Sequence, residues 1–124
     1  MAKVDKSVPR YAYENVEVLD VYDADTLTVK INLGFNIAFN VKLRLARINA
    51  WEVKGEEKEK GQEAAAYLRT KIGQVREEGN KIHIETFKDS QEKFGRYLAE
   101  LYIDGKNIND ELVKLGFAKY QDYG

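Results

Sequence analysis

The sequence of 124 residues contains no cysteine, one proline and only one histidine, His83. Without cysteine, the chain can form neither a disulfide nor a thiolate metal site, and it has no cysteine nucleophile. A lone histidine excludes a zinc site built from several histidines. Any metal site must therefore rely on oxygen ligands, which suit hard cations such as Ca²⁺ and Mg²⁺.

The chain also lacks an excess of charge of one sign and any long apolar run. Its 20 Lys and Arg residues against 21 Asp and Glu residues give a net charge of −1, whereas proteins that bind nucleic acid over a broad surface are usually strongly basic. Phosphate binding would have to be local. No apolar run reaches the roughly 18 residues of a membrane span, and residues 1–10 lack the apolar core of a signal peptide. We expect a monomer without a membrane partner, cytoplasmic by default or secreted if a signal segment was removed.

Length and composition predict one globular domain. At roughly 150 residues per domain, the chain is long enough for one, and its 44% of hydrophobic residues suit a packed core. The start of the chain is polar and contains Pro9, the only proline. We interpret residues 1–14 as a flexible N-terminal arm and residues 15–124 as a single domain.

Apolar periodicity predicts five strands and two helices. Leu27, Val29 and Ile31 alternate with polar residues, which indicates a strand, and apolar spacings of four, four and three from Ala64 to Val75 indicate an amphipathic helix. The expected strands cover residues 16–23, 27–33, 37–46, 81–87 and 97–103, and the expected helices residues 63–75 and 108–115. This order, β-β-β-α-β-β-α, predicts an α+β, mainly-β fold: a five-stranded antiparallel OB-fold barrel with two helices.

Two carboxylates, Asp23 and Asp25, stand at the junction of the first two expected strands. With no cysteine or histidine nearby, paired carboxylates suit a hard cation. Aspartate is also common in ordinary turns between strands. The pair alone leaves both interpretations open.

Arg44 and Glu52 are candidates for phosphate chemistry. Arg44 lies on the non-core face of a strand otherwise rich in Val, Leu and Phe, and a guanidinium can bind a phosphate through two hydrogen bonds. Glu52, just after that strand, could act as a general base on water. The alternative is an exposed strand arginine followed by a solvated charged stretch.

A third candidate group is the sequence Lys93-Phe94-Gly95-Arg96. Glycine permits close approach of a ligand, arginine suits phosphate, and a phenylalanine ring can stack on a base. A basic loop that precedes a strand would have the same composition.

The order and spacing of these groups resemble those of the staphylococcal nuclease (thermonuclease) family over about residues 16–120. The family carries an Asp-Gly-Asp-Thr turn, matched by residues 23–26 with Ala24 in place of glycine. An arginine, apolar residues and an Asp-Thr/Ala-Pro-Glu sequence follow in the family, and residues 44–52 match that run in length. The Lys-Tyr/Phe-Gly-Arg loop of the family is matched by residues 93–96, and its next strand, turn and helix by residues 97–118.

The resemblance implies an SNase-like OB-fold domain with a bound Ca²⁺ ion, for which Mg²⁺ or Mn²⁺ could substitute. By motif position, the metal ligands are the Asp25 carboxylate, the Asn49 side chain and the Ala50 carbonyl group. Asp23 would lie beside them and hold ligand waters.

The resemblance also implies the remaining site residues. The catalytic residues are Arg44 and Arg96, which would bind the phosphate, and Glu52, which would act as the general base through a water. The substrate-binding residues are Lys93 and Phe94, which match positions beside the nucleotide, and the candidate tyrosines Tyr120 and Tyr123.

The sequence departs from the family pattern at further positions. Asn49 stands where the best-known members carry a second metal carboxylate, and Trp51 replaces the usual proline. Our leading hypothesis is a calcium-dependent phosphodiesterase, a thermonuclease-like endonuclease whose partner is DNA or RNA. Asn49 and the near-neutral charge favour the alternative, a catalytically weakened module that binds nucleic acid or protein without cleavage.

Overall fold

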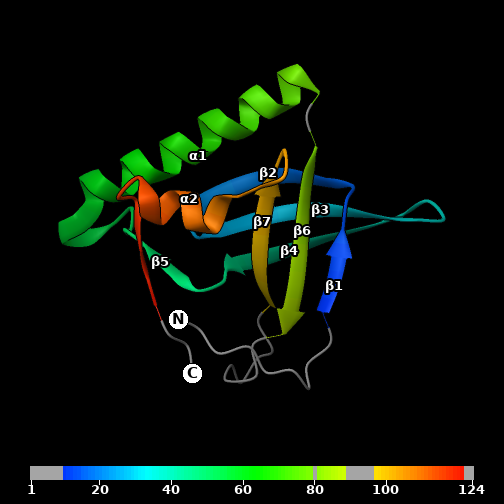
Figure 1. Cartoon of the computed structure of the whole chain (residues 1–124), viewed down its shortest axis with the longest axis horizontal. Helices are drawn as coiled ribbons and strands as arrows, with labels where there is room; N and C mark the ends of the chain where they lie inside the picture. Colours follow the sequence, from blue (N-terminus) through cyan, green and yellow to red (C-terminus); the bar gives the residue numbers. More distant parts are fainter. Residues whose placement is uncertain (1–9, 80, 89–96, 122–124) are drawn as a thin grey trace.

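The computed structural model describes residues 10–79, 81–88 and 97–121 (Figure 1). Within these residues the chain forms nine strands, two α-helices and one 3-10 helix. In chain order they are β1 (Arg10–Tyr13), β2 (Val16–Asp23), β3 (Thr26–Gly34), β4 (Ile37–Leu45), β5 (Ile48–Ala50), the 3-10 helix η1 (Gly55–Glu57), α1 (Lys58–Glu78), β6 (Ile82–Lys88), β7 (Tyr97–Ile103), β8 (Lys106–Asn107), α2 (Ile108–Lys114) and β9 (Ala118–Tyr120).

Most strands belong to one mixed sheet in the order β1-β6-β7-β4-β3-β2, with β8 paired to β7, while β5 and β9 form a separate antiparallel pair. The prediction of a mainly-β, α+β fold with two helices is confirmed. The prediction of five strands, all antiparallel, is wrong, because β4 and β7 run parallel, with Leu43 opposite Tyr97. Between them the chain passes through α1 and β6, and such a long connection lets the second strand start at the same end as the first.

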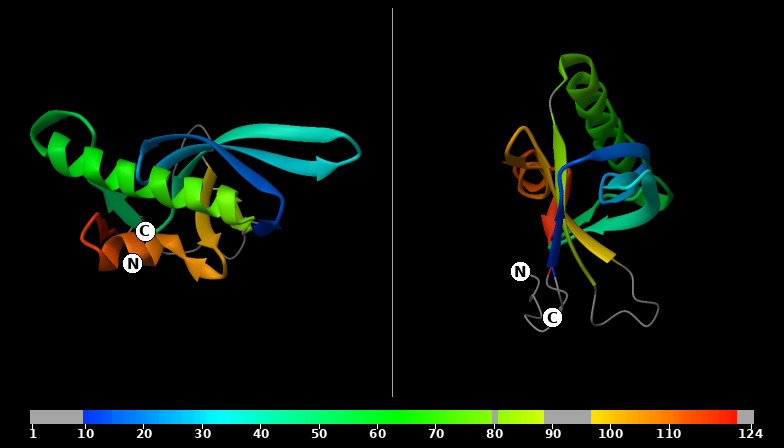
Figure 2. Two further views of the ribbon diagram at one scale, coloured as in Figure 1. Left: turned by 90° about the horizontal axis from the view of Figure 1, so that it is seen from above. Right: turned by 90° about the vertical axis from the view of Figure 1, so that its right-hand side faces the viewer.

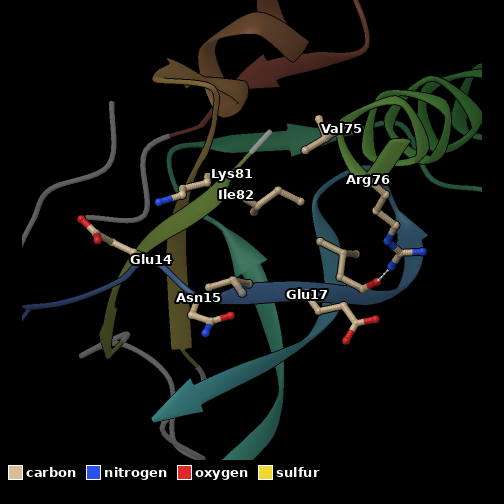
Figure 3. Close-up of a pocket in the computed structure, with 9 residues that line it drawn as sticks. Glu14, Asn15, Glu17, Val75, Arg76, Lys81 and Ile82 are labelled. Atoms are coloured by element: carbon tan, nitrogen blue, oxygen red, sulfur yellow. Dashed lines mark hydrogen bonds between the residues drawn. The ribbon is translucent and has the colours of Figure 1, made fainter. Parts of the chain in front are cut away.

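The prediction of a closed barrel is also wrong, since the hydrogen-bonded sheet stays open between β2 and the edge made by β6 and β1. Two arginines of α1 reach β2 from the side: Arg76 donates to the Val18 carbonyl, and Arg69 donates to the Val21 carbonyl at 2.7 Å. These side chains satisfy carbonyl groups of β2 that a closing strand would otherwise bind. A cavity of about 480 Å³ lies at the opening, with Val75, Arg76 and Ile82 in its lining (Figure 3).

The two edges of the sheet are nevertheless consecutive in the chain, because only Glu14 and Asn15 separate β1 from β2. Strand β1 pairs with β6, so that Tyr13 lies opposite Ile84. Residues 10–13, predicted to belong to the flexible N-terminal arm, form an edge strand of the sheet. No helix among the described residues is both long enough and apolar enough to span a membrane.

Helix α1 crosses one face of the sheet (Figures 1 and 2). It contains the whole of the predicted helix and begins five residues earlier, at Lys58. The apolar stripe read from the sequence is buried, and Leu68 and Ile72 are 0% and 4% exposed. The helix ends at Gly79, whose φ of 71° is left-handed and suits glycine.

The short helix α2 anchors the turn that leads into β5. Its residue Asn109 is fully buried and hydrogen-bonds to three backbone groups: the side-chain amide donates to the carbonyls of Ala46 and Ala99 at 2.9 and 3.0 Å, and its oxygen accepts from the Leu101 N–H at 3.0 Å. One side chain thus ties the end of β4 to β7. This contact holds the start of the chain from Ala46 to Ala50, where two predicted site residues lie.

Candidate functional site

The candidate site forms where the β2–β3 turn meets the end of β4. Asp25 lies in that turn and is 3% exposed. Arg44 lies opposite Thr26 in the register of β3 and β4, and the Leu45 N–H donates to the Asp25 carbonyl at 2.8 Å. Antiparallel pairing therefore places the guanidinium beside the carboxylate, although 19 positions separate them in the chain.

The Asp25 carboxylate is compensated on both oxygens. Its Oδ2 accepts from Arg44 Nη1 at 2.5 Å and from the Ala50 N–H at 2.8 Å, and its Oδ1 accepts from Thr26 Oγ1 at 3.1 Å. A buried charge is tolerated only when it is paired and hydrogen-bonded in this way. The contact with Ala50 also binds β5 to the β2–β3 turn.

Arg44 also hydrogen-bonds to the chain around Asn49. Its Nη2 donates to the Ile48 carbonyl at 3.2 Å and to Asn49 Oδ1 at 3.3 Å. The structure thus brings together Asp25, Arg44, Asn49 and Ala50. Asn49 remains exposed, so this side of the group faces solvent.

Asp23 adds a second carboxylate at the edge of the group. Its Oδ1 accepts from the Val53 N–H at 3.1 Å. The pKa of Asp23 is raised above its ordinary value, mainly because the carboxylate is partly buried. The negative charges of Asp25 and Glu52 also raise this pKa, whereas the Val53 hydrogen bond and the positive charge of Arg44 lower it. Glu52 is exposed and lies close enough to Asp23 for their charges to interact.

The backbone at Glu52 is held against α1 by a glycine. A Cβ atom on Gly61 would lie 1.8 Å from the Glu52 carbonyl oxygen and 2.6 Å from the Val53 nitrogen. Only a residue without a side chain allows this approach. Sequence reasoning missed this role, because the contact joins segments that no local pattern relates.

Trp51 fixes the chain between Ala50 and Glu52. Its Nε1 donates to the Gly116 carbonyl at 3.0 Å, and the ammonium groups of Lys60 and Lys119 each lie 4.8 Å from the centroid of its ring system. A hydrogen bond and contacts with two ammonium groups therefore hold this part of the chain in place.

Tyr120 joins a different group of charges. Its hydroxyl donates to Asp110 Oδ1 at 2.9 Å, and Arg47 donates to the same oxygen at 2.8 Å and to both Glu100 oxygens at 2.7 and 2.9 Å. The hydrogen bond from Arg47 lowers the pKa of Asp110, and Asp110 in turn raises the pKa of Tyr120. The structure does not bring the Tyr120 hydroxyl into the Arg44 group.

Four of the predicted site residues, Lys93, Phe94, Arg96 and Tyr123, lie outside the described residues. Sequence reasoning also passed over Tyr22 and Lys42, which line a cavity next to Arg44, and Lys54, whose ammonium group lies 5.8 Å from the centroid of the Tyr22 ring. For Lys42 a signal exists, since it stands two positions before Arg44 and so shares its strand face.

The oxygen atoms near Arg44 belong to the carboxylates of Asp25 and Asp23 and to the side-chain amide of Asn49. Oxygen donors of these kinds suit a hard cation. Within residues 10–79, 81–88 and 97–121, however, no three His, Cys, Asp or Glu side chains are grouped so that they could hold a metal ion. A cation at this place would depend on the neutral Asn49 oxygen and on backbone or water oxygens.

A protein-family model described as "Staphylococcal nuclease homologue" matches residues 42–124, more than half of the chain. The match includes Arg44, Asn49 and Glu52, and it begins after the two carboxylates of the β2–β3 turn.

The contact of Gly61 with Glu52 can be tested by replacing glycines within α1. Gly61→Ala should lower the free energy of unfolding by about 1–3 kcal/mol, because the added methyl group collides with backbone. Gly73→Ala is the matched control: its Cβ would meet nothing within 4 Å, and it should raise stability by about 0.5–1 kcal/mol. Urea unfolding measures both, and equal effects would contradict this packing.

The Arg47–Asp110 pair predicts a pH-dependent contribution to stability. Since the pKa of Asp110 is lower in the folded protein than its ordinary value of 3.8, its ionised form stabilises the fold above that value, and the contribution disappears as the pH falls through the folded pKa. Asp110→Asn should therefore destabilise the protein at neutral pH and progressively less in acid. Asp20→Asn, an exposed change on β2, is the control. A penalty for Asp110→Asn that stays constant from neutral pH into acid would refute the assignment.

Proposed function

Because the chain belongs to the staphylococcal nuclease homologue family, we propose that it is a metal-dependent nuclease that hydrolyses phosphodiester bonds of DNA or RNA. Family membership supports a nuclease-type or nucleic-acid-binding function. The observation that carries the catalytic proposal is the convergence of Asp25 and Asn49 oxygens on the Arg44 guanidinium.

Arg44 and Arg96 would stabilise the charge that develops on the phosphate in the transition state. Arg44 is preorganised for this task, since three oxygens of Asp25, Ile48 and Asn49 hold its guanidinium near the end of β4. Arg96 immediately precedes Tyr97, which pairs with Leu43, the neighbour of Arg44. This pairing supports the proposal that one phosphate reaches both arginines.

Glu52 would act as the general base, taking a proton from the attacking water. Its carboxylate is exposed and can therefore meet both water and substrate. The close packing of its backbone on Gly61, together with the Val53–Asp23 hydrogen bond, fixes the chain from which it projects. A catalytic base needs such positioning.

The cation of the proposed site would be Ca²⁺, with Mg²⁺ or Mn²⁺ as alternatives, held by Asp25, Asn49 and the Ala50 carbonyl, with Asp23 beside it. When bound, such an ion polarises a phosphoryl oxygen. The Ala50 N–H already donates to Asp25, so the same short strand aligns the carboxylate and the backbone.

The rest of the proposed site follows the family pattern. Lys93, Phe94, Tyr120 and Tyr123 would contact the nucleotide, and the SNase-like domain would act as a monomer. Tyr120 is 53% exposed in β9, which pairs with β5 next to Asn49.

Cleavage assays test the proposal directly. Single- and double-stranded DNA and RNA are incubated with Ca²⁺, Mg²⁺, Mn²⁺ or EDTA, and we expect cleavage with a divalent cation and none with EDTA. Glu52→Gln and Arg96→Ala should each reduce turnover by roughly 10²-fold or more. Glu56→Gln, an exposed change in the adjacent η1, is the control. Binding of nucleic acid without cleavage under every condition would instead favour the non-catalytic module.

The neutral ligand Asn49 predicts weak binding of Ca²⁺ to the free protein. Asn49→Asp adds a carboxylate beside Asp25, and we expect Ca²⁺ affinity to rise on the order of tenfold, because affinity depends on ligand charge. Asn40→Asp adds the same charge on β4, outside the Arg44 group, and should have no such effect. Calorimetric titration measures these affinities, and equal values for Asn49→Asp and the wild type would show that Asn49 is not a ligand.

A further inference from the structure

A cavity of about 400 Å³ adjoins Arg44 on the outer face of the β2–β3–β4 sheet. Asp23 and Arg44 line one side of it, and Tyr22, Thr26 and Lys42 line the rest, over Leu43. Two of these residues belong to the candidate site. Tyr22 and Lys42 have no part in the proposed reaction, although the cavity joins them to the proposed phosphate-binding residue.

Tyr22 presents an aromatic ring between two cations. Tyr22 lies near the end of β2 and is 45% exposed. The ammonium groups of Lys42, on β4, and Lys54, in the loop after Glu52, each lie 5.8 Å from its centroid. Three separate segments of the chain therefore bring one ring and two positive charges to the same place. An aromatic face beside cations is the combination that binds an unstacked base and its phosphate.

The spacing along β4 fits a polynucleotide strand. Lys42 and Arg44 are two residues apart, so they project from the same face at a separation of about 7 Å. Their partners on β3 are Thr28 and Thr26, which are uncharged. Negative groups on this side include Asp23, in the candidate site, and Glu17 and Asp20 on the far strand β2, opposite Lys30 and Thr28. The β4 side is therefore the basic one, and it leads directly to Arg44.

We propose that Tyr22, Lys42 and Lys54 form a nucleotide subsite next to Arg44, in which a base stacks on the Tyr22 ring and the adjoining phosphate binds the two lysines. The inference rests on the proposed function, because Arg44 would hold the phosphate to be cleaved. Since a base must leave its stack to reach the ring, the subsite takes single-stranded DNA or RNA, or a frayed end, in preference to an intact duplex.

Replacement of the ring tests the stacking contact. The probes are a labelled single-stranded oligothymidylate and an abasic strand of equal length, titrated in EDTA at low salt. Tyr22→Leu should weaken binding of oligothymidylate about tenfold and leave binding of the abasic strand unchanged, whereas Tyr22→Phe should bind both like the wild type. The control Tyr11→Leu removes another exposed tyrosine, on β1. Equal affinities of Tyr22→Leu and Tyr11→Leu for oligothymidylate would overturn the subsite. It would also be overturned if Tyr22→Leu lost the same affinity for the abasic strand as for oligothymidylate.

Replacement of the lysine tests the phosphate contact. The affinity falls as the salt concentration rises. Lys42→Gln should make the plot of log affinity against log salt less steep by about one for both oligonucleotides, because one fewer phosphate is neutralised. Lys106→Gln, on β8, should leave the slope unchanged. An unchanged slope for Lys42→Gln, or the same loss for both variants, would contradict the assignment of Lys42.

Cleavage of the same oligothymidylate with a divalent cation separates this inference from the proposed function. Tyr22→Leu should raise KM and leave kcat near the wild-type value, since the ring binds substrate away from the reacting atoms. A wild type that binds but cleaves nothing refutes the nuclease proposal and leaves the binding results to decide the subsite. A wild type that cleaves, with Tyr22→Leu matching it in KM and binding, refutes only the subsite. A wild type that neither binds nor cleaves refutes both.

Discussion

The ion pair between Arg44 and Asp25 is the interaction on which the site depends. Asp25 is 3% exposed, and a carboxylate at that depth must be paired and hydrogen-bonded. Arg44, the Ala50 N–H and Thr26 meet this requirement and come from β4, β5 and the start of β3. Compensation of a single buried charge thus sets the relative positions of three segments. The geometry proposed for phosphate chemistry is in this sense also a requirement of folding.

The remaining supports act on the segment that connects β4 with α1. Asn109 holds its beginning through the Ala46 carbonyl, Trp51 holds its middle through the Gly116 carbonyl, and Gly61 packs against the next residue, Glu52. Each support comes from a different part of the chain, and each is a direct contact with backbone or a hydrogen bond to it. Glu52 can therefore be exposed to solvent and still project from a fixed position.

Local patterns in the sequence predicted both helices and five of the nine strands, β2, β3, β4, β6 and β7, and the matched motifs predicted that Asp25, Arg44 and Asn49 would lie together. The openness of the sheet could not be predicted, because it depends on Arg69 and Arg76 reaching β2 carbonyls from α1. The parallel pairing of β4 with β7 was missed for a similar reason, since it is set by the path of the chain through α1 and β6. The contact of Gly61 with Glu52 likewise exists only once α1 has packed.

The balance of charge around Arg44 explains how a chain with a net charge of −1 can be suited to bind polyanions. Asp23, Asp25 and Glu52 gather near one guanidinium, so the site alone carries more negative than positive charge. A phosphate is attracted there only if further positive charge is supplied. A divalent cation on the carboxylate side would supply part of it, and Lys42 and Lys54 supply two charges on the side of Tyr22. The proposed phosphate binding would therefore be a local property, and it would not need a strongly basic surface.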